Sequence, residues 1–259
     1  MVTVDHVDSF HCYDGKTGEI VALELQKIAS FGFGKGGMGP NFEDMNNLLP
    51  IDGCVEYYGR VLGEQQAERY LERMLNGIEW RNDEAVIFGR HIITKRKVAW
   101  YGDNVYTYTY SKITRASLSW TSELLELKAL TEKLTGARYN SCLLNLYHDG
   151  EEGMAWHSDD EKELEPGGAI ASLSFGAERR FLFRHRESKQ TIELALAAGS
   201  LLVMKGDTQD HWLHSLPKMK KVRLPRVNLT FRTMVRKSDG RPRQRGGDGP
   251  MGGAAAGRG

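Results

Sequence analysis

Two segments upstream of residue 137 repeat apolar residues at helical spacing. The segment from Gly63 to Asn76, GEQQAERYLERMLN, has its charges on one side and an apolar stripe on the other, formed by Ala67, Tyr70, Leu71, Met74 and Leu75. In SELLELKALTEKL the stripe consists of Leu124, Leu127, Leu130 and Leu134. Gly136 follows at a position where helices commonly end. The pattern therefore predicts two helices that each pack one face on a core.

After Gly136 the pattern changes to short β-type runs separated by turn residues. These runs are RYNSCLLNLYH, AIASLSFG, RRFLFRH, TIELAL, SLLVMK and RVNLTFR. Many short strands at this spacing are typical of a barrel or sandwich. Helices followed by such strands predict an α+β fold, in which a double-stranded β-helix, or jelly roll, is flanked by helices.

Both ends of the chain lack a periodic apolar pattern. Residues 30–50 are rich in glycine and polar residues, so we expect residues 1–50 to form a loosely ordered leader. Beyond Met234 the chain has almost no large apolar side chains, and residues 236–259 are expected to form a disordered tail rich in Arg and Gly. One domain, residues 51–235, remains between these ends.

Composition limits the class of protein. The 259 residues are 40% hydrophobic, which suits one soluble domain of enzyme size. The 3 cysteines include no CxxC pair, so they indicate neither a disulfide framework nor a zinc knuckle. No stretch approaches the roughly 20 apolar residues that cross a bilayer, and the N-terminus does not resemble a signal peptide. We expect an intracellular monomer, in the cytoplasm or, in a eukaryote, the nucleus.

Charge is unevenly distributed along the chain. Residues 1–217 carry 23 Lys and Arg against 32 Asp and Glu, whereas residues 218–259 carry 12 against 2. A basic end of this kind can attract phosphates, although many such tails bind nothing specific. Charge alone leaves a nucleic-acid role open.

Candidate metal ligands cluster in WHSDDE, where His157 and Asp159 stand two residues apart. In an extended segment this spacing points an imidazole and a carboxylate to the same side. A third ligand is expected from a later strand, and QDHWLHSLPK offers His211 and His214. We choose His214, which lies just before the SLPK turn, and leave His211 as a bystander or supporting group. Two histidines and one carboxylate are typical of iron(II) oxygenases, which leave open positions on the metal.

The segment RVNLTFR alternates without a break. One face carries Arg226, Asn228, Thr230 and Arg232, and the other carries Val227, Leu229 and Phe231. If the apolar face packs under a helix or a second sheet, the arginines line the interior. Buried guanidinium groups need an anion, which predicts a bound dicarboxylate that reaches from the metal to an arginine.

In order and spacing, NLYHDG, WHSDDE, SLSFGAERRFLFRH, WLHSLPK and RVNLTFR resemble the catalytic half of the AlkB-type dioxygenases, over about residues 50–235. The resemblance implies that iron(II) is held by His157, Asp159 and His214. It implies that 2-oxoglutarate contacts Asn145, Tyr147, Arg226, Asn228 and Arg232. Arg226 would take the distal carboxylate of 2-oxoglutarate, and Arg232 the end nearer the metal.

The segment RKVAWYGD, followed by YTYTYS, resembles the substrate-recognition lid of that family, at about residues 88–115. Aromatic rings with interleaved cations can stack an extruded base and meet phosphates. The resemblance assigns base contacts to Tyr108, Trp100 and Tyr110. It also places Glu161 against the damaged base. The family's Ser-Gly at the hairpin reads Ser111-Lys112 here, so the turn can differ.

By resemblance, the activity is oxidative dealkylation of nucleic-acid bases such as 1-methyladenine and 3-methylcytosine, in DNA or RNA. It uses dioxygen and couples to 2-oxoglutarate decarboxylation, as in repair of DNA damage. Two alternatives stay open. One is a 2-oxoglutarate-dependent oxygenase that acts on a protein. The other is a non-enzymatic RNA-binding module that depends on the Arg/Gly tail.

Overall fold

The structure is a computed structural model that describes residues 10–13, 20–23, 47–87, 90–103, 107–110 and 113–235. Two large antiparallel sheets dominate it. The six-stranded sheet has the spatial order β2 (Ile20–Leu23), β1 (Phe10–Tyr13), β12 (Thr191–Leu196), β11 (Arg179–His185), β14 (Trp212–Leu216) and β9 (Met154–His157). The seven-stranded sheet has the order β3 (Cys54–Arg60), β13 (Ser200–Lys205), β10 (Ile170–Gly176), β15 (Arg226–Arg232), β8 (Ser141–Tyr147), β5 (Arg90–Gly102) and β4 (Arg81–Ile87).

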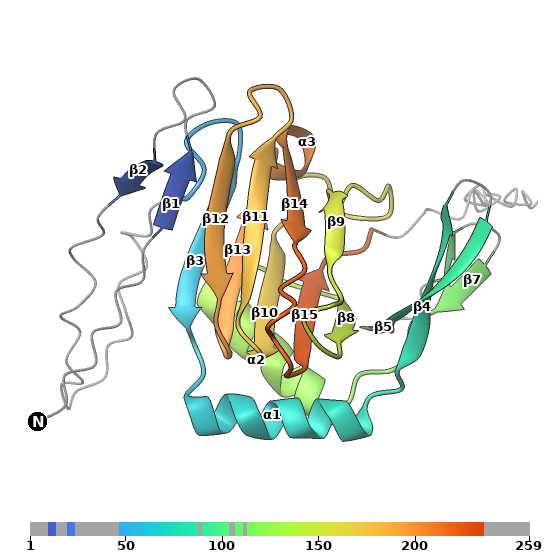
Figure 1. Cartoon of the computed structure of the whole chain (residues 1–259). Helices are drawn as coiled ribbons and strands as arrows, with labels where there is room; N and C mark the ends of the chain where they lie inside the picture. The colour runs from blue at the N-terminus through green and yellow to red at the C-terminus, as the bar shows by residue number, and fades with distance from the viewer. Residues whose placement is uncertain are drawn as a thin grey trace, which may run out of the picture.

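The remaining described elements are one hairpin and three helices. The hairpin pairs β6 (Thr107–Tyr110) with β7 (Ile113–Ala116). The helices are α1 (Glu64–Gly77), α2 (Ser122–Thr135) and α3 (Thr208–His211). Figure 1 shows α1 and α2 beside the sheets, with β4, β5 and β7 to one side. Among the described residues, no helix combines the length and apolar character that crossing a bilayer requires.

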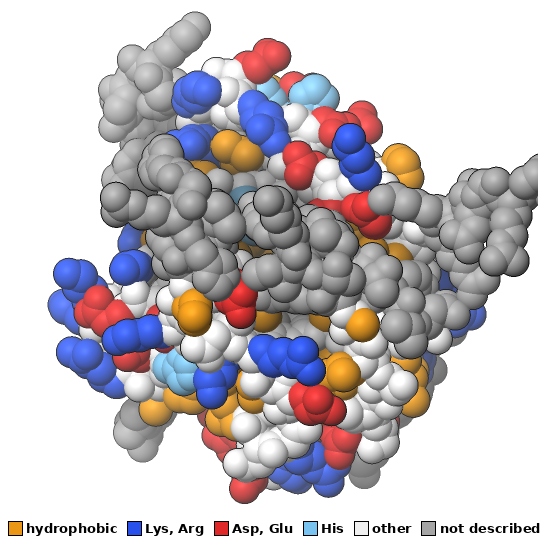
Figure 2. Space-filling model, turned by 90° about the vertical axis from the view of Figure 1, so that its right-hand side faces the viewer, with side chains coloured by type: hydrophobic (Ala, Val, Ile, Leu, Met, Phe, Trp, Pro, Cys, Tyr) orange, Lys and Arg blue, Asp and Glu red, His pale blue; other side chains and the backbone are white. Residues whose placement is uncertain are grey.

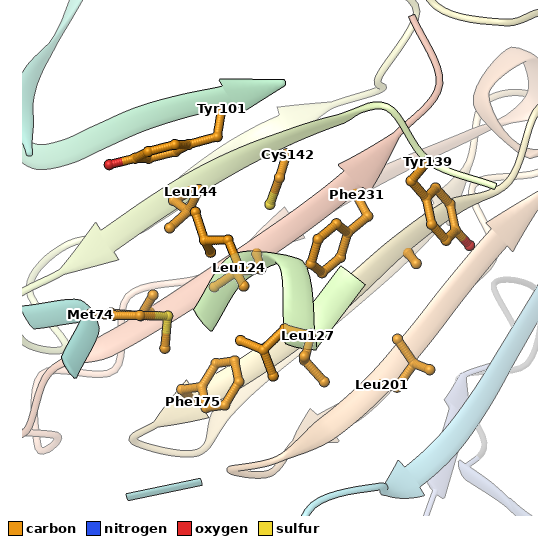
Figure 3. Packing of buried hydrophobic residues seen from close by; sticks show 14 of the residues in the cluster. Met74, Tyr101, Leu124, Leu127, Tyr139, Cys142, Leu144, Phe175, Leu201 and Phe231 are labelled. Atoms are coloured by element: carbon orange, nitrogen blue, oxygen red, sulfur yellow. The ribbon is translucent and has the colours of Figure 1, made fainter. Parts of the chain in front are cut away.

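Two apolar clusters hold these layers together. The first lies between the helices and the seven-stranded sheet, where Leu124 and Leu127 of α2 approach Phe175, Leu144 and Phe231 (Figure 3). The second lies between the two sheets and includes Phe183, Leu194, Leu202, Met204 and Trp212. Strand β13 contributes alternate residues to each cluster, as a strand buried on both faces must. The predicted α+β fold with a jelly-roll core is confirmed.

Both predicted helices are present, within one residue of the expected bounds. The N-terminus of α2 is capped by Thr121, whose side chain accepts a hydrogen bond from the Leu124 amide at 3.3 Å. Its C-terminus is capped by Gly136 at φ 69°, a left-handed conformation that glycine adopts without strain. Helix α2 therefore begins and ends where its local sequence supplies caps.

Seven of the described strands precede Gly136, although the predicted run of short strands begins only after it. Three of them, β3, β4 and β5, belong to the seven-stranded sheet. The sequence pattern did not predict β3. Only Val55 of its seven residues is fully buried, so apolar and polar side chains do not alternate along it. These strands extend the second sheet at both edges and do not change the fold class.

The described chain enters the core slightly before the expected boundary at residue 51. The Asn47 side chain accepts hydrogen bonds from the Leu49 and Val55 amides at 3.0 and 2.8 Å, and Leu49 is buried. Strands β1 and β2 fall within the expected leader, and β1 pairs with β12. The other residues before 47, and the expected tail at 236–259, lie outside the described residues.

Neighbouring leucines of α2 provide a matched test of this packing. Leu124 is 0% exposed and Leu125 is 47% exposed. We expect Leu124→Ala to lower the free energy of unfolding by about 2–5 kcal/mol, because it leaves a cavity under the helix. Leu125→Ala should change it by less than about 1 kcal/mol. Urea denaturation followed by circular dichroism measures both, and equal losses would contradict this description of the core.

Candidate active site

A cavity of about 450 Å³ lies beside the apolar cluster that fills the space between the sheets. Its wall includes ten of the twelve residues selected from the sequence, namely Trp100, Asn145, Tyr147, His157, Asp159, Glu161, His214, Arg226, Asn228 and Arg232. These side chains come from both sheets and from the segment after β9. Residues up to 132 positions apart in the sequence are thus brought to one space.

His157, Asp159 and His214 converge within this cavity. Strands β9 and β14 pair His157 with His214, and the two imidazole centroids are 4.2 Å apart. The Nε2 atom of each histidine lies 3.8 Å from Asp159 Oδ1. His157 Nδ1 lies 2.8 Å from the Ala155 carbonyl oxygen, to which it can donate, so Nε2 keeps its lone pair toward the other two groups.

Burial determines the charge of His214. It lowers the pKa of His214 to about 4, with the Asp159 carboxylate acting in the opposite direction. The imidazole is therefore neutral near pH 7, the form that binds metals. His211, the other candidate, lies at the end of α3 and is not a member of this group.

The segment that carries Asp159 is held by two groups that sequence analysis did not single out. Gln209 Oε1 accepts a hydrogen bond from the Asp159 amide at 2.8 Å. Arg186 donates from Nη2 to Ser158 Oγ at 2.7 Å and to the Gln209 carbonyl at 3.3 Å. No local pattern marks these residues, because the contacts join segments separated by 28 and 50 positions.

Arg226 is buried in the cavity wall, only 2% exposed, and pairs with no carboxylate among the described residues. It donates from Nη2 to Ser174 Oγ at 3.0 Å and to Asn228 Oδ1 at 2.8 Å. Its Nε atom has no hydrogen-bond partner in the described chain. Burial lowers the pKa of Arg226 to about 10, which still leaves it charged near pH 7. A buried cation with an unused donor is suited to a carboxylate ligand.

Arg232 and Glu161 meet each other. Arg232 Nη1 lies 3.0 Å from Glu161 Oε1, while Glu161 Oε2 and Arg232 Nε are buried without hydrogen-bond partners in the described chain. Burial would lower the pKa of Arg232, but the carboxylates of Glu161 and Asp159 raise it on balance. The sequence expectation gave these residues separate partners, and the structure brings them together in the same wall.

Three arginines surround the Tyr147 ring. The guanidinium carbons of Arg96, Arg179 and Arg226 lie 5.9, 5.9 and 5.6 Å from the ring centroid. Arg96 also donates to Asn145 Oδ1 at 2.9 Å and forms an ion pair with Asp83. The sequence places Arg96 only in the lid segment RKVAWYGD, whereas the structure also places its side chain in the cavity wall. Cationic groups around Tyr147 make this end of the cavity attractive to anions.

The residues expected to contact a base are only partly described. Trp100 lines the cavity and donates from Nε1 to Ser141 Oγ at 2.7 Å. Tyr108 and Tyr110 belong to β6, and their side chains lie outside the described residues.

The donors fit an iron ion and a dicarboxylate. Two imidazole nitrogens and a carboxylate oxygen lie within 4.8 Å of one another, as three ligands on one face of a metal must. In the same wall, Arg226 supplies the unpaired cation that one end of 2-oxoglutarate requires. The cavity can therefore hold both groups together.

Comparisons with known proteins agree with this chemistry. Residues 54–232 match the 2OG-Fe(II) oxygenase superfamily. The chain is 39% identical over 198 residues to DNA oxidative demethylase ALKBH2 of Mus musculus, covering 72% of this chain and 83% of that protein. It is 38% identical over 198 residues to alpha-ketoglutarate-dependent dioxygenase alkB homolog 3 of Homo sapiens, covering 71% of this chain and 68% of that protein.

The fold also resembles the solved structure of OsALKBH1. The TM-score is 0.51 at 15% sequence identity, covering 69% of this chain and 97% of that chain. The family match and the identity to two curated relatives over most of their length carry the assignment. The chain belongs to the 2OG-Fe(II) oxygenase superfamily, and within it to the AlkB-type iron(II)- and 2-oxoglutarate-dependent dioxygenases.

Proposed function

We propose that this enzyme removes alkyl groups from nucleic-acid bases by oxidation, and that His157, Asp159 and His214 hold its iron. The observation that carries the proposal is the convergence of these three donors with an unpaired, buried Arg226 in one cavity. Together with dioxygen, iron and 2-oxoglutarate supply the oxidising power when bound. The protein contributes two imidazoles and a carboxylate as ligands, an anion site and a shaped cavity.

We assign the 2-oxoglutarate site to residues that share the inner face of β15 and β8. The assigned residues are Asn145, Tyr147, Arg226, Asn228 and Arg232. Arg226 holds one carboxylate at the end of the cavity that the Tyr147 ring lines. Arg232 lies beside Asp159 and serves the end nearer the metal, with Glu161 holding its guanidinium in place. This arrangement orients the cosubstrate before substrate arrives.

The proposed substrate is a base such as 1-methyladenine or 3-methylcytosine. Relatives are named DNA oxidative demethylases, and Trp100 offers an aromatic surface in the cavity wall for stacking. Glu161 also faces the cavity, where its carboxylate favours the positive charge of such a base. Tyr108 and Tyr110 complete the proposed contacts from β6.

Attraction to phosphates is assigned to the basic C-terminal segment. Figure 2 shows the side of the molecule that carries β4, β5 and β7, and its described Lys, Arg, Asp and Glu side chains are interspersed. Residues 218–259, in contrast, carry 12 basic side chains against 2 acidic ones. A basic segment raises the encounter rate with nucleic acid without reading its sequence.

We also propose a cellular location and an oligomeric state for the protein. Nucleic acid is inside the cell, and Cys54 and Cys142 are free thiols, which suits a reducing compartment. We assign the protein to the cytoplasm or, in a eukaryote, the nucleus. We expect a monomer, since the described donors of the cavity all come from one chain.

The iron ligands are tested with a pair of adjacent aspartates. Asp159→Ala removes the oxygen that lies 3.8 Å from both imidazoles and should abolish 2-oxoglutarate turnover. Asp160→Ala, at an exposed neighbouring position, should keep turnover within about twofold. Succinate formation in the presence of iron measures both. Full turnover by the Asp159 variant would rule out the assigned ligand set.

Arg226 is tested through binding of 2-oxoglutarate. Arg226→Gln removes the buried cation and should cost about 2 kcal/mol or more of binding, a rise in Kd of roughly 30-fold or greater. The control is Arg223→Gln, an exposed residue just upstream, which should leave Kd unchanged. Anaerobic calorimetry on the iron-loaded protein measures Kd directly. An unchanged Kd for Arg226→Gln would move the anion site elsewhere.

The substrate is tested with oligonucleotides that contain 1-methyladenine or 3-methylcytosine, as DNA and RNA, single- and double-stranded. We expect demethylation of at least one member, seen by mass spectrometry, and we expect it to persist in a chain truncated after Val235. Turnover only on methylated peptides would favour a protein substrate. Nucleic-acid binding that disappears with the tail, without any demethylation, would favour an RNA-binding module.

A further inference from the structure

A second group of metal-binding side chains lies outside the catalytic cavity. It consists of Asp52 in the segment before β3, His185 at the end of β11 and His211 at the end of α3. One potential ligand atom from each lies within 4.8 Å of the other two. None of the three lines the catalytic cavity. Three separate segments thus bring two imidazoles and a carboxylate to one point.

His185 contributes a buried nitrogen whose hydrogen-bonding capacity is unused. The side chain is 3% exposed, and its Nε2 atom has no hydrogen-bond partner in the described chain. Asp52 Oδ2 lies 3.2 Å away, without hydrogen-bond geometry. A buried polar atom without a partner is costly, so such an atom is commonly satisfied by a ligand or water.

Contacts made by neighbouring groups hold the three segments together. The Arg186 amide donates to the His211 carbonyl at 2.7 Å, which joins the end of β11 to α3. Trp212 Nε1 donates to the Ile51 carbonyl at 3.0 Å, which joins β14 to the segment that carries Asp52. The rings of His185 and His211 are nearly parallel, at 10° and 6.3 Å. These two hydrogen bonds therefore hold the three segments together without using the candidate ligand atoms.

We propose that Asp52, His185 and His211 form a second transition-metal site, suited to Zn²⁺. Two imidazole nitrogens and one carboxylate oxygen are ligands that zinc accepts, with water in the fourth position. Magnesium and calcium are disfavoured, since they prefer oxygen ligands throughout. The site joins the segment before β3 to the end of the six-stranded sheet, so its metal stabilises the domain.

Binding requires a small rearrangement. Tetrahedral zinc ligands at about 2.1 Å are separated by about 3.4 Å, so donors now up to 4.8 Å apart must close. The Asp52 side chain is half exposed and can move freely. The buried His185 side chain can stay in place.

The proton on His185 must also change nitrogen. Its Nδ1 atom now accepts a hydrogen bond from the Ser188 amide at 3.1 Å, which places the proton on Nε2. Metal binding through Nε2 moves that proton to Nδ1 and releases the Ser188 amide. Ser188 is exposed, so water can replace the lost bond. The site therefore binds more weakly than one whose histidines donate to a carboxylate behind them.

Calorimetric titration of the full-length chain with Zn²⁺ tests the site. The background variant His157→Ala/Asp159→Ala keeps only one of the three assigned iron ligands, and we expect it to bind one equivalent with a Kd tighter than about 10 µM. Adding Asp52→Asn or His211→Gln should weaken this binding at least about tenfold. Adding His148→Gln, an exposed histidine on another turn, should leave it unchanged.

A second measurement tests whether His185 binds the metal, in a protein that keeps this residue. Zn²⁺ should raise the hydrogen-exchange rate of the Ser188 amide in the background variant, because the imidazole no longer accepts its bond. The same ion should raise Tm, and His211→Gln should remove that rise. The proposal would be overturned if the background variant bound no zinc, or if Asp52→Asn and His211→Gln both left tight binding intact. It would also be overturned if zinc bound without changing the exchange rate of the Ser188 amide.

Discussion

The division between the two faces of β15 is the constraint on which the rest of the structure depends. Val227, Leu229 and Phe231 face the helices and are fully buried in an apolar cluster. The alternate residues face the space between the sheets, where Arg226 and Arg232 are as deeply buried. A strand that carries two buried cations on one face is stable only if the other face is anchored and the cations find anions.

The two arginines meet this requirement differently. Arg232 has an internal anion, Glu161, which keeps its guanidinium paired inside the protein. Among the described residues, Arg226 donates only to the neutral oxygens of Ser174 and Asn228. Burial consequently lowers the pKa of Arg226, whereas the carboxylates near Arg232 outweigh burial and raise the pKa of Arg232. The unbalanced charge lies where we propose that a carboxylate of 2-oxoglutarate binds.

The four histidines of the two candidate metal-binding groups lie on β9, β11 and β14 of the six-stranded sheet and on α3. His214 lies within β14, and His211 ends the short helix that leads into it. Gln209 of the same helix accepts from the Asp159 amide, and Arg186, next to His185, donates to Ser158. The catalytic group and the proposed zinc site are therefore connected through one helix and one turn. Order in the segment before β3 and order around the iron ligands share these contacts.

Much of the fold followed from local pattern alone. Helical spacing located α1 and α2 because their burial is one-sided. Short β-type runs between turn residues located β8, β10, β11, β12, β13 and β15. The alternation of RVNLTFR even separated its buried cations from its buried apolar residues. Strand β3 could not be found this way, since it pairs at a sheet edge with a single fully buried side chain.

The candidate site shows the same division between what local pattern predicts and what tertiary contacts decide. The sequence by itself determined the candidate residues for iron and 2-oxoglutarate, because His157, Asp159, His214 and the two arginines belong to short motifs with fixed spacing. Only the tertiary structure decided how these residues are paired. Arg232 pairs with Glu161, and Arg226 pairs with no described carboxylate. His185 lies beside Asp52 and His211. These contacts join segments that are distant in the chain. Sheet pairing determines which distant segments meet, and no local pattern records it.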